Sequence, residues 1–287
     1  MPIFRSLPEV RPAGPEDHNA LLYFLNREAD VHRHLDWRAP LEWLGAQPFL
    51  VATFEQRIQA VLACPPDPPQ TAWIRLFAAR GHLEKQEYFE ILLKAAQQSL
   101  LSAGADSQIL AIGLQPWFQD ILASCGFINP QSIVVLEWSA DLPPELPARA
   151  GFEIRRMELA DLPQVAELDA EAFEPVWNNS LETLSLAFQQ SAYSTVAVNP
   201  DGIIGYQIST AIPMSGHLAR LAVRPHLQRE HVGYALVREL IVSFQKQSVW
   251  RVTVNTQDDN YASLALYQKM GFRRTGEVFP VFVLPKG

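Results

Sequence analysis

The most informative part of this chain is Leu221-Ala-Val-Arg-Pro-His-Leu-Gln-Arg-Glu-His-Val-Gly-Tyr-Ala-Leu236. An apolar strand ends before Arg224-Pro225, a loop follows, and a helix begins near Gly233. The first turn of a helix leaves backbone N–H groups unpaired and carries partial positive charge, so it can bind an anion. Glycine there lets a phosphate approach the backbone closely. The stretch predicts an anion site or, on a simpler interpretation, close packing of a helix on a strand.

The charge around this stretch is opposite to that of the whole chain. The chain has 23 Lys and Arg against 31 Asp and Glu, a formal net charge of −8. This balance argues against sequence-independent binding to nucleic acid. Residues 220–251 nevertheless hold six basic and two acidic side chains, a local charge of +4. That fits either an anionic ligand or ordinary charge scatter on a solvated helix.

The composition of the 287 residues, 48% of them hydrophobic, is that of a globular protein with a sizeable core. No apolar run approaches the ~18 residues of a spanning helix, and the first residues lack the apolar core of a signal peptide. We therefore expect a cytoplasmic protein that does not enter the membrane. Its two cysteines, Cys64 and Cys125, are too few for a disulfide framework or a zinc site, and no metal is expected.

The chain repeats itself with an offset of 144 to 145 residues. Arg11 to Asp17 recurs as Arg155 to Asp161, 144 residues later. The pairs Arg75-Leu76 and Gly126-Phe127 recur 145 residues later as Arg220-Leu221 and Gly271-Phe272. A drift of one residue over a whole half indicates two copies of one fold. The proline-rich segment 140–151 reads as a linker, which predicts domains at 1–139 and 152–287.

Each copy alternates strands and helices around a central hairpin, which predicts an α/β domain with a mixed, mostly antiparallel sheet flanked by helices. In the second copy Asp161 is the expected N-cap of the first helix, and Gly271 ends the last one. The other expected elements are helices over 232–246 and 261–270 and strands over 152–155, 194–198, 203–210, 217–223, 250–254 and 279–284. In the first copy, the strand-rich stretches 109–112 and 133–138 are candidates for packing against the second half.

Two motifs in the second copy carry a resemblance to a known family. Gln228-x-x-His231-x-Gly233 follows the strand, and Asn260-x-x-Ser-x-x-Leu-Tyr-x-x-x-Gly-Phe272 begins some 25 residues later. They resemble the motifs Gln/Arg-x-x-Gly-x-Gly/Ala and Asn-x-x-Ala-x-x-Leu-Tyr-x-x-x-Gly-Phe of the GCN5-related N-acetyltransferase (GNAT) family. The resemblance covers about 152–284 and departs from the family at His231, which stands where the first motif glycine would be. It implies two tandem GNAT-like domains.

The resemblance also implies the site residues for acetyl-CoA as cosubstrate. The strand Leu221-Ala222-Val223 would pair with the pantetheine arm, and an amide near Val223 would polarise the thioester oxygen. Asn260 would contact the pantetheine or the start of the next helix, and Tyr267 would protonate the leaving thiolate. His231 either crowds the pyrophosphate or donates a hydrogen bond to it. The backbone amides that would hold the pyrophosphate are those of Gln228, Arg229, Glu230, His231, Val232, Gly233, Tyr234 and Ala235.

No motif fixes the general base that would take a proton from the amine. His217, at the start of the strand before the loop, and Glu174, in the loop region where the family places acceptor contacts, are the two candidates. Phe173, Trp177 and Tyr206 either line an acceptor pocket or belong to the core. Neither cysteine has a histidine in local register, so an acyl-enzyme is not expected.

The first copy lacks these features at the equivalent positions. Leu83, Gln86 and Tyr88 stand in the place of Gln228, His231 and Gly233. Three nearby glutamates would repel a phosphate, and the counterparts of Tyr267 and Asn260 are Leu122 and Gln115. The first copy is therefore predicted to keep the fold without the cofactor.

The sequence thus favours an N-acetyltransferase that moves an acetyl group to a primary amine of a small molecule or peptide by direct attack in a ternary complex. The alternative is a non-catalytic protein that binds CoA or another ligand, or a scaffold. The acceptor, the length of the acyl group and the oligomeric state, monomer or homodimer, stay open at this stage.

Overall fold

The computed structural model describes residues 8–81, 83–139, 141–146 and 151–286. It divides into two compact units, which we call unit 1 (1–130 with 280–287) and unit 2 (131–279). The predicted domains 1–139 and 152–287 differ from these units because the last strand of each half contributes to the sheet of the other. Of the predicted linker 140–151, residues 140 and 147–150 lie outside the described residues.

Equivalent elements recur at the predicted offset. The strands β8 (Ile128–Trp138) and β14 (Arg273–Val283) both have 11 residues and begin 145 residues apart. The helices α3 (Pro116–Ser124) and α7 (Tyr261–Lys269) both have 9 residues and show the same offset. The duplication read from the sequence is therefore present in the structure.

A salt bridge is also duplicated. Arg11 Nη2 lies 2.7 Å from Asp17 Oδ1, and Arg155 Nη2 lies 2.8 Å from Asp161 Oδ1. Asp161 does precede the helix α4 (Leu162–Ala172), as predicted, but its side chain does not cap that helix. It accepts from Arg155 and from the backbone N–H of Glu158 at 2.8 Å, so it closes the turn between the first strand and the helix.

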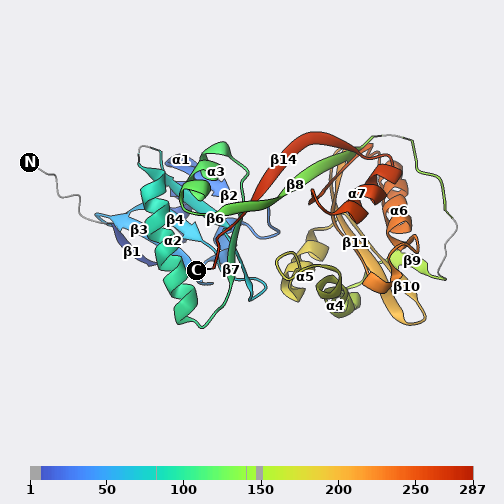
Figure 1. Ribbon diagram of the computed structural model, residues 1–287, viewed down its shortest axis with the longest axis horizontal. Helices are drawn as coiled ribbons and strands as arrows, with labels where there is room; N and C mark the ends of the chain where they lie inside the picture. The colour runs from blue at the N-terminus through green and yellow to red at the C-terminus, as the bar shows by residue number, and fades with distance from the viewer. Residues whose placement is uncertain (1–7, 82, 140, 147–150, 287) are drawn as a thin grey trace, which may run out of the picture. The chain divides into compact units, whose positions relative to one another are not determined.

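The sheet of unit 2 has helices on both faces (Figure 1). Beyond β13 (Arg251–Gln257) come β12 (Ser215–Val223), β11 (Gly202–Ile212), β10 (Tyr193–Asn199) and β9 (Glu153–Arg156), in this spatial order. On the other side of β13, β8 pairs antiparallel over Ile133–Trp138, and the start of β14 lies next to β8.

The helices of unit 2 lie on two sides of this sheet (Figure 1). α6 (Val232–Lys246) and α7 bury one face in a core around Phe244, Leu240 and Trp138. α4 and α5 (Leu181–Gln190) cover the other face. The predicted helix 232–246 is confirmed to the residue, whereas α5 had no counterpart among the expectations.

Unit 1 repeats this plan with one addition. Its sheet has the order β1 (Glu9–Pro12), β3 (Phe49–Phe54), β4 (Arg57–Ala63), β6 (Leu76–Arg80) and β2 (Ala29–Arg33), all antiparallel. A second set pairs β5 (Thr71–Trp73) with β7 (Gln108–Ile112) in parallel. The helices are α1 (His18–Arg27), α2 (Lys85–Ser102) and α3. The strand β2 has no equivalent in unit 2.

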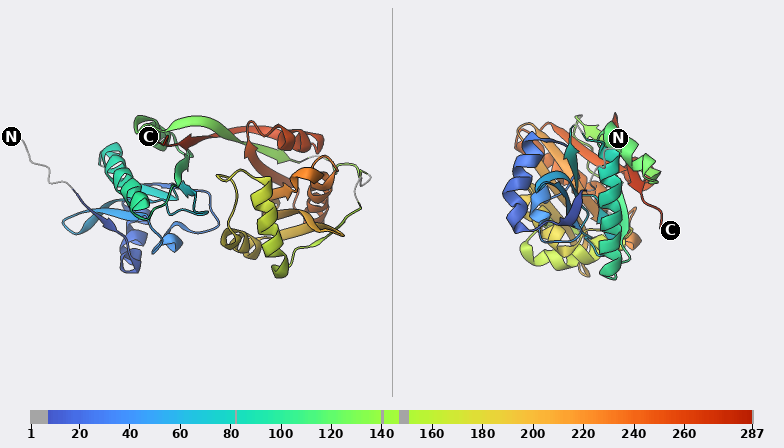
Figure 2. Two further views of the ribbon diagram at one scale, coloured as in Figure 1. Left: turned by 60° about the horizontal axis from the view of Figure 1, so that its bottom comes forward. Right: turned by 90° about the vertical axis from the view of Figure 1, so that its left-hand side faces the viewer.

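The two 11-residue strands each serve both units. β8 follows α3 of unit 1 and then pairs with β13 in unit 2, while the end of β14, Val281–Val283, pairs antiparallel with β7 in unit 1. The two strands lie side by side in both orientations (Figures 1 and 2). The prediction that 133–138 would pack against the second half is confirmed. The last strand is predicted over 279–284 but begins at Arg273 in the structure. The predicted start is too late because the first residues of the strand are exposed and show no apolar pattern.

Candidate active site

The strand β12 separates from β13 halfway along its length. The two strands pair in parallel over Ser215–Leu218 and Arg251–Val254. Beyond Leu218, β12 continues to Val223 paired only with β11 on its other side. A bulge opposite Ile208 and Ser209 marks the point of departure, and bulges commonly re-aim a strand in this way. We call Leu221–Val223 the open edge of β12.

Backbone groups of the open edge face away from β11. The N–H of Arg224 donates to Ile204 O at 2.9 Å, so residues 222 and 224 form hydrogen-bonded pairs with β11. In an antiparallel ladder the intervening residues direct their N–H and C=O groups to the opposite side. The amides of Leu221 and Val223 therefore face the space beside β13, where an extended ligand would pair with them as an additional strand.

The loop that follows leads these amides into the start of α6. After a short turn at Pro225–Leu227, Arg229 and His231 adopt positive φ angles of 70° and 65° in the left-handed region, and His231 is the N-cap of α6. The amides of the first helical turn have no preceding turn to bond to, and the helix dipole makes this end positive. The side chain of Gln228 reaches back to Val223 O at 3.4 Å.

Gly233 lies in this first turn with room for a methyl group. A Cβ atom there would meet Leu266 Cδ2 at 3.4 Å and Val223 Cγ2 at 3.6 Å, which are ordinary van der Waals distances. Gly233 is thus next to both the open edge and α7. Among its neighbours, Val232 is buried in the core, and Tyr234 Oη donates to Pro144 O at 2.8 Å.

The second motif forms the start of α7. Asn260 is the N-cap of α7, and its Oδ1 accepts from Ser263 N at 3.1 Å. Of the two roles expected for Asn260, the contact with the start of the helix is present. Tyr267 is 4% exposed, and burial raises the pKa of its phenol well above the usual value. Tyr267 therefore carries its proton at neutral pH, as a general acid must.

The two candidate bases lie in different surroundings. His217 Nδ1 is 2.9 Å from Thr253 Oγ1 at the last paired section of β12 and β13, and burial lowers the pKa of its imidazole. A neutral imidazole at pH 7 can accept a proton. Glu174 is exposed in the loop between α4 and α5, where its carbonyl accepts from Trp177 N at 2.8 Å. The structure places His217 on the strand that carries the open edge.

A buried network fixes the loop between α4 and α5. Asp169, on α4, has no exposed surface and pairs with Arg220 Nε and Nη2, both at 2.7 Å. Tyr206 Oη donates to the same carboxylate. Tyr206 is therefore a core residue. Of the two alternatives for this side chain, the structure supports packing in the core and not the lining of an acceptor pocket. Of this network, the sequence repeat points only to Arg220, which is the counterpart of Arg75. Asp169 could not be predicted, because it lies in a helix with an ordinary amphipathic pattern.

In unit 1 the equivalent strand edge is occupied. β5 pairs in parallel with β7. After Ile74 and Arg75 the chain continues as β6, which pairs with β4, so β6 separates from β7 as the end of β12 separates from β13. Here, however, β2 pairs with the far side of β6, from Ala29 opposite Arg80 to Arg33 opposite Leu76. The His32 ring stacks on Phe118 at 4.0 Å and its Nδ1 lies 3.1 Å from Gln115, the counterpart of Asn260.

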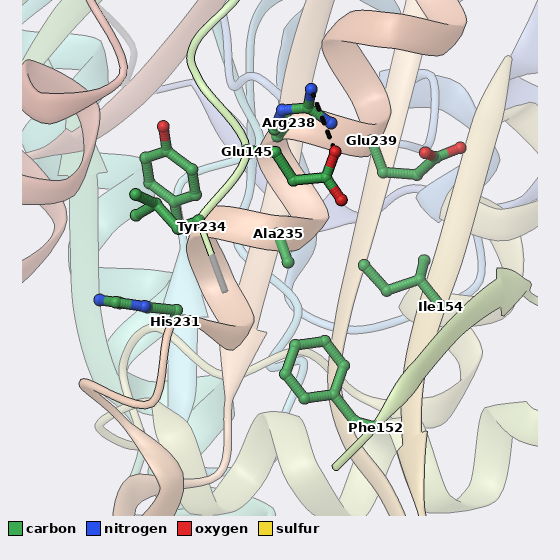
Figure 3. Close-up of a pocket in the computed structure, with 9 residues that line it drawn as sticks. Glu145, Phe152, Ile154, His231, Tyr234, Ala235, Arg238 and Glu239 are labelled. Atoms are coloured by element: carbon green, nitrogen blue, oxygen red, sulfur yellow. Dashed lines mark ion pairs between the residues drawn. The ribbon is translucent and has the colours of Figure 1, made fainter. Parts of the chain in front are cut away.

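A cavity of about 310 Å³ lies beside α6 (Figure 3). It lies between α6, the start of β9 and the segment before it, and the ion pair between Arg238 and Glu145 crosses its rim at 3.7 Å. His231 lines this cavity, and its ring is directed away from Phe152 and Ile154 (Figure 3). The described lining residues are Glu145, Leu146, Phe152, Ile154, His231, Tyr234, Ala235, Arg238 and Glu239.

Nucleophilic cysteine chemistry does not fit the described residues. Burial raises the pKa of Cys64 to about 12 and that of Cys125 to about 11, so neither thiol ionises at neutral pH. Within the described part of the chain, no three His, Cys, Asp or Glu side chains lie close enough to hold a metal ion. No helix there is both long and apolar enough to cross a membrane.

Comparison with known proteins agrees with this architecture. Residues 162–272 match the model of the acetyltransferase (GNAT) family. A solved GCN5-related N-acetyltransferase from Sphaerobacter thermophilus aligns over 98% of both chains with a TM-score of 0.61 and 15% identity. A tandem GNAT protein from the clavulanic acid biosynthesis pathway aligns over 97% of this chain and 99% of its own, with a TM-score of 0.59 and 15% identity. Residues 162–272 are thus similar to the GNAT family, and the fold of the whole chain is that of two tandem GNAT-like domains.

Curated relatives match parts of the chain. N-acetyltransferase family 8 member 3 from Mus musculus is 41% identical over 66 residues, which are 23% of this chain and 29% of the mouse protein. The [ribosomal protein bS18]-alanine N-acetyltransferase of Escherichia coli (strain K12) is 27% identical over 120 residues, 42% of this chain and 79% of that protein. The match therefore spans less than a third of the mouse relative.

Proposed function

We propose that the protein is an N-acetyltransferase that moves an acetyl group from acetyl-CoA to a primary amine within a ternary complex. The observation that carries the proposal is the open edge of β12, which leads directly into the positive end of α6. The extended pantetheine arm of acetyl-CoA would pair with the strand edge, and its pyrophosphate would bind at the start of the helix, so the two features must lie next to each other. In unit 2 a backbone edge at Leu221 and Val223 is followed by unpaired amides near Gly233.

Each residue in the proposed mechanism acts through a group already described. The amides of the open edge bind and orient the cosubstrate, and that of Val223 donates to the carbonyl oxygen as negative charge develops there. The amine nitrogen attacks the thioester carbon, the C–S bond breaks, and Tyr267 gives its proton to the leaving sulfur. The proton released by the amine goes to His217 or Glu174, directly or through water. Holding amine and thioester together supplies much of the rate.

The acceptor is proposed to be a small-molecule or peptide amine. The net charge of −8 favours a cationic acceptor, such as a polyamine, an aminoglycoside or a protein amine. The name of the Escherichia coli relative, an alanine N-acetyltransferase of a ribosomal protein, adds a peptide amine as a specific candidate. We also propose that unit 1 binds no cofactor, because β2 pairs with the edge that would be needed.

The test is titration calorimetry with acetyl-CoA, followed by an assay of thiol release with spermidine and with a hexapeptide beginning with alanine. We expect one molecule bound per chain and release of CoA with one of the two amines. Binding without release across a wide amine panel would favour the alternative, a protein that senses CoA. No binding at millimolar acetyl-CoA or CoA would exclude both, and two molecules per chain would contradict the role of β2.

A further inference from the structure

We propose that Arg220 and Asp169 are positioning residues, which hold the loop 173–180 in place for the acceptor. The inference rests on the proposed function and extends it to the second substrate. This loop carries Glu174, one of the two candidate bases, and Trp177. Arg220 comes directly before the open edge, so one side chain links the strand that would bind the cosubstrate to the loop proposed to meet the amine.

The carboxylate of Asp169 has partners on both oxygens. Oδ1 accepts from Arg220 Nη2 at 2.7 Å and from the backbone N–H of Asn179 at 2.7 Å. Oδ2 accepts from Arg220 Nε at 2.7 Å and from Tyr206 Oη. A buried carboxylate is tolerated when it is paired and hydrogen-bonded in this way. Asp169 therefore connects the end of the loop, at Asn179, to β11 and β12.

Arg220 reaches the beginning and the middle of the loop. Its Nη2 donates to Trp177 O at 2.7 Å, and its guanidinium lies 3.5 Å from the centre of the Phe173 ring. The loop is thus attached at Phe173, Trp177 and Asn179, three points along its length. Removing this attachment would loosen the loop around Glu174 and Trp177 while leaving the backbone of the open edge unchanged.

Lysine cannot replace Arg220 in this arrangement. A guanidinium presents several donors in a fixed plane, so it can bond both carboxylate oxygens and a carbonyl at once, whereas an ammonium is a point charge. Unit 1 offers a matched control. Arg75 occupies the same position of the repeat and donates to Asp36 Oδ2 at 2.9 Å and Asp67 O at 3.1 Å, both within unit 1.

The experiment compares Arg220→Lys, Arg75→Lys and the unaltered protein by amide hydrogen exchange and steady-state kinetics. In Arg220→Lys we expect exchange of 173–180 to accelerate about tenfold. The kcat/KM for the amine that the unaltered protein acetylates, spermidine or the alanine hexapeptide, should fall about 100-fold. The Kd for acetyl-CoA should stay within about twofold, and Arg75→Lys should leave all three quantities unchanged.

Unchanged exchange of 173–180 in Arg220→Lys would overturn the proposal. A similar loosening of all of unit 2, with weaker binding of acetyl-CoA, would also overturn it, because Arg220 would then support the fold in general. If Arg220→Lys does not fold, Tyr206→Phe removes a single hydroxyl from the network and should show the same pattern to a smaller degree. Exchange in the loop needs no amine, so it decides the proposal even if the proposed acetyltransferase activity fails.

Discussion

Unit 1 and unit 2 contain the same strand separation but use it differently. In unit 2 the strand β12 leaves β13 and keeps an open edge at Leu221–Val223. In unit 1 the strand β2 pairs with the equivalent edge of β6, and His32 fills the space next to α3. An unpaired strand edge is costly to bury, so it is either covered by the chain itself or left for a ligand. Both units therefore keep the same framework, and the edge is closed in unit 1 and open in unit 2.

The shared features are those that the framework needs. The Arg–Asp salt bridge between the first strand and helix is present in both units with nearly identical distances. The arginine before the separated strand segment, Arg75 or Arg220, is also kept and pairs with an aspartate in each unit. The features that differ, the glycine in the first turn of the helix and the tyrosine of the last helix, are those that a ligand would need.

The largest expected effect comes from placing a carboxylate at the start of α6. Gly233→Glu should weaken acetyl-CoA binding at least about 100-fold, since two negative charges about 4 Å apart repel by about 4 kcal/mol at an effective dielectric constant of about 20. Gly233→Ala is the matched control and should bind normally, because its Cβ meets only ordinary contacts. Gln86→Glu, on the corresponding exposed turn of unit 1, should have no effect. Calorimetric Kd values check all three, and undiminished affinity in Gly233→Glu would move the phosphate site elsewhere.

A second difference between the units is the phenol of α7. Tyr267→Phe should lower kcat about 100-fold, because proton transfer by a positioned acid contributes about 10²- to 10⁴-fold, and should leave the Kd for acetyl-CoA unchanged. Tyr261→Phe, on the same helix but 78% exposed, serves as the control. The assay is thiol release under saturating conditions. Full turnover in Tyr267→Phe would remove this residue from the mechanism.

The closed edge of unit 1 should make this unit sensitive to acid. Burial lowers the pKa of His32 to about 4, from an unfolded value of 6.5, so the unfolded chain binds the proton more readily. Stability is then complete above pH 6.5 and falls as the pH drops toward 4, by about 3 kcal/mol for a shift of about 2.5 units. Burial also lowers the pKa of His34, which acts in the same direction.

Urea unfolding at pH 7 and pH 4.5 measures this loss of stability. In His32→Gln the dependence on pH should be reduced, because the glutamine does not titrate, while acetyl-CoA binding by unit 2 at pH 7 should stay unchanged. A free energy of unfolding that depends on pH equally in both proteins would show that β2 is not held by a neutral histidine.

The smallest effect is expected at the departure from the family motif. His231 has a φ of 65°, a conformation that costs a residue with a Cβ about 1 kcal/mol and that glycine adopts freely. His231→Gly should raise the free energy of unfolding by about 0.5–1 kcal/mol and keep or improve acetyl-CoA binding. Ser248→Gly, at a φ of 61° beyond the other end of α6, should stabilise similarly without changing the Kd. A loss of binding in His231→Gly alone would show that the imidazole contacts the ligand.

Several elements were predictable because their signals are local. The stripe of Val232, Leu236, Leu240 and Phe244 has helical spacing, and α6 has the predicted bounds. By contrast, β2 is a five-residue strand with mixed burial, and it depends on its pairing with β6 and on contacts of His32 with α3. The first residues of β14 are exposed and carry no apolar pattern. Both strands depend on partners far away in the sequence, which periodicity does not reveal.

The residues of the candidate site also fall into those with a local sequence signal and those that depend on distant partners. Spacing and motif resemblance identified the loop from Gln228 to Ala235, Asn260 and Tyr267, because such motifs are local in the chain. The network of Asp169, Tyr206 and Arg220 joins a helix and two strands, with sequence separations of 37 and 51 residues between its bonded pairs. No local pattern distinguishes Asp169 from a surface residue of an amphipathic helix.

The duplication, the α/β class and the position of the loop before α6 can all be read from the amino-acid sequence, since they follow from repeats, periodicity and short motifs. Three features emerge only in the folded chain: β8 and β14 each serve both units, β2 closes the edge in unit 1, and Arg220 connects the open edge to the loop 173–180. The physical reason is that backbone pairing and buried charge pairing are satisfied by whichever groups the fold brings together, and those partners are distant in the chain.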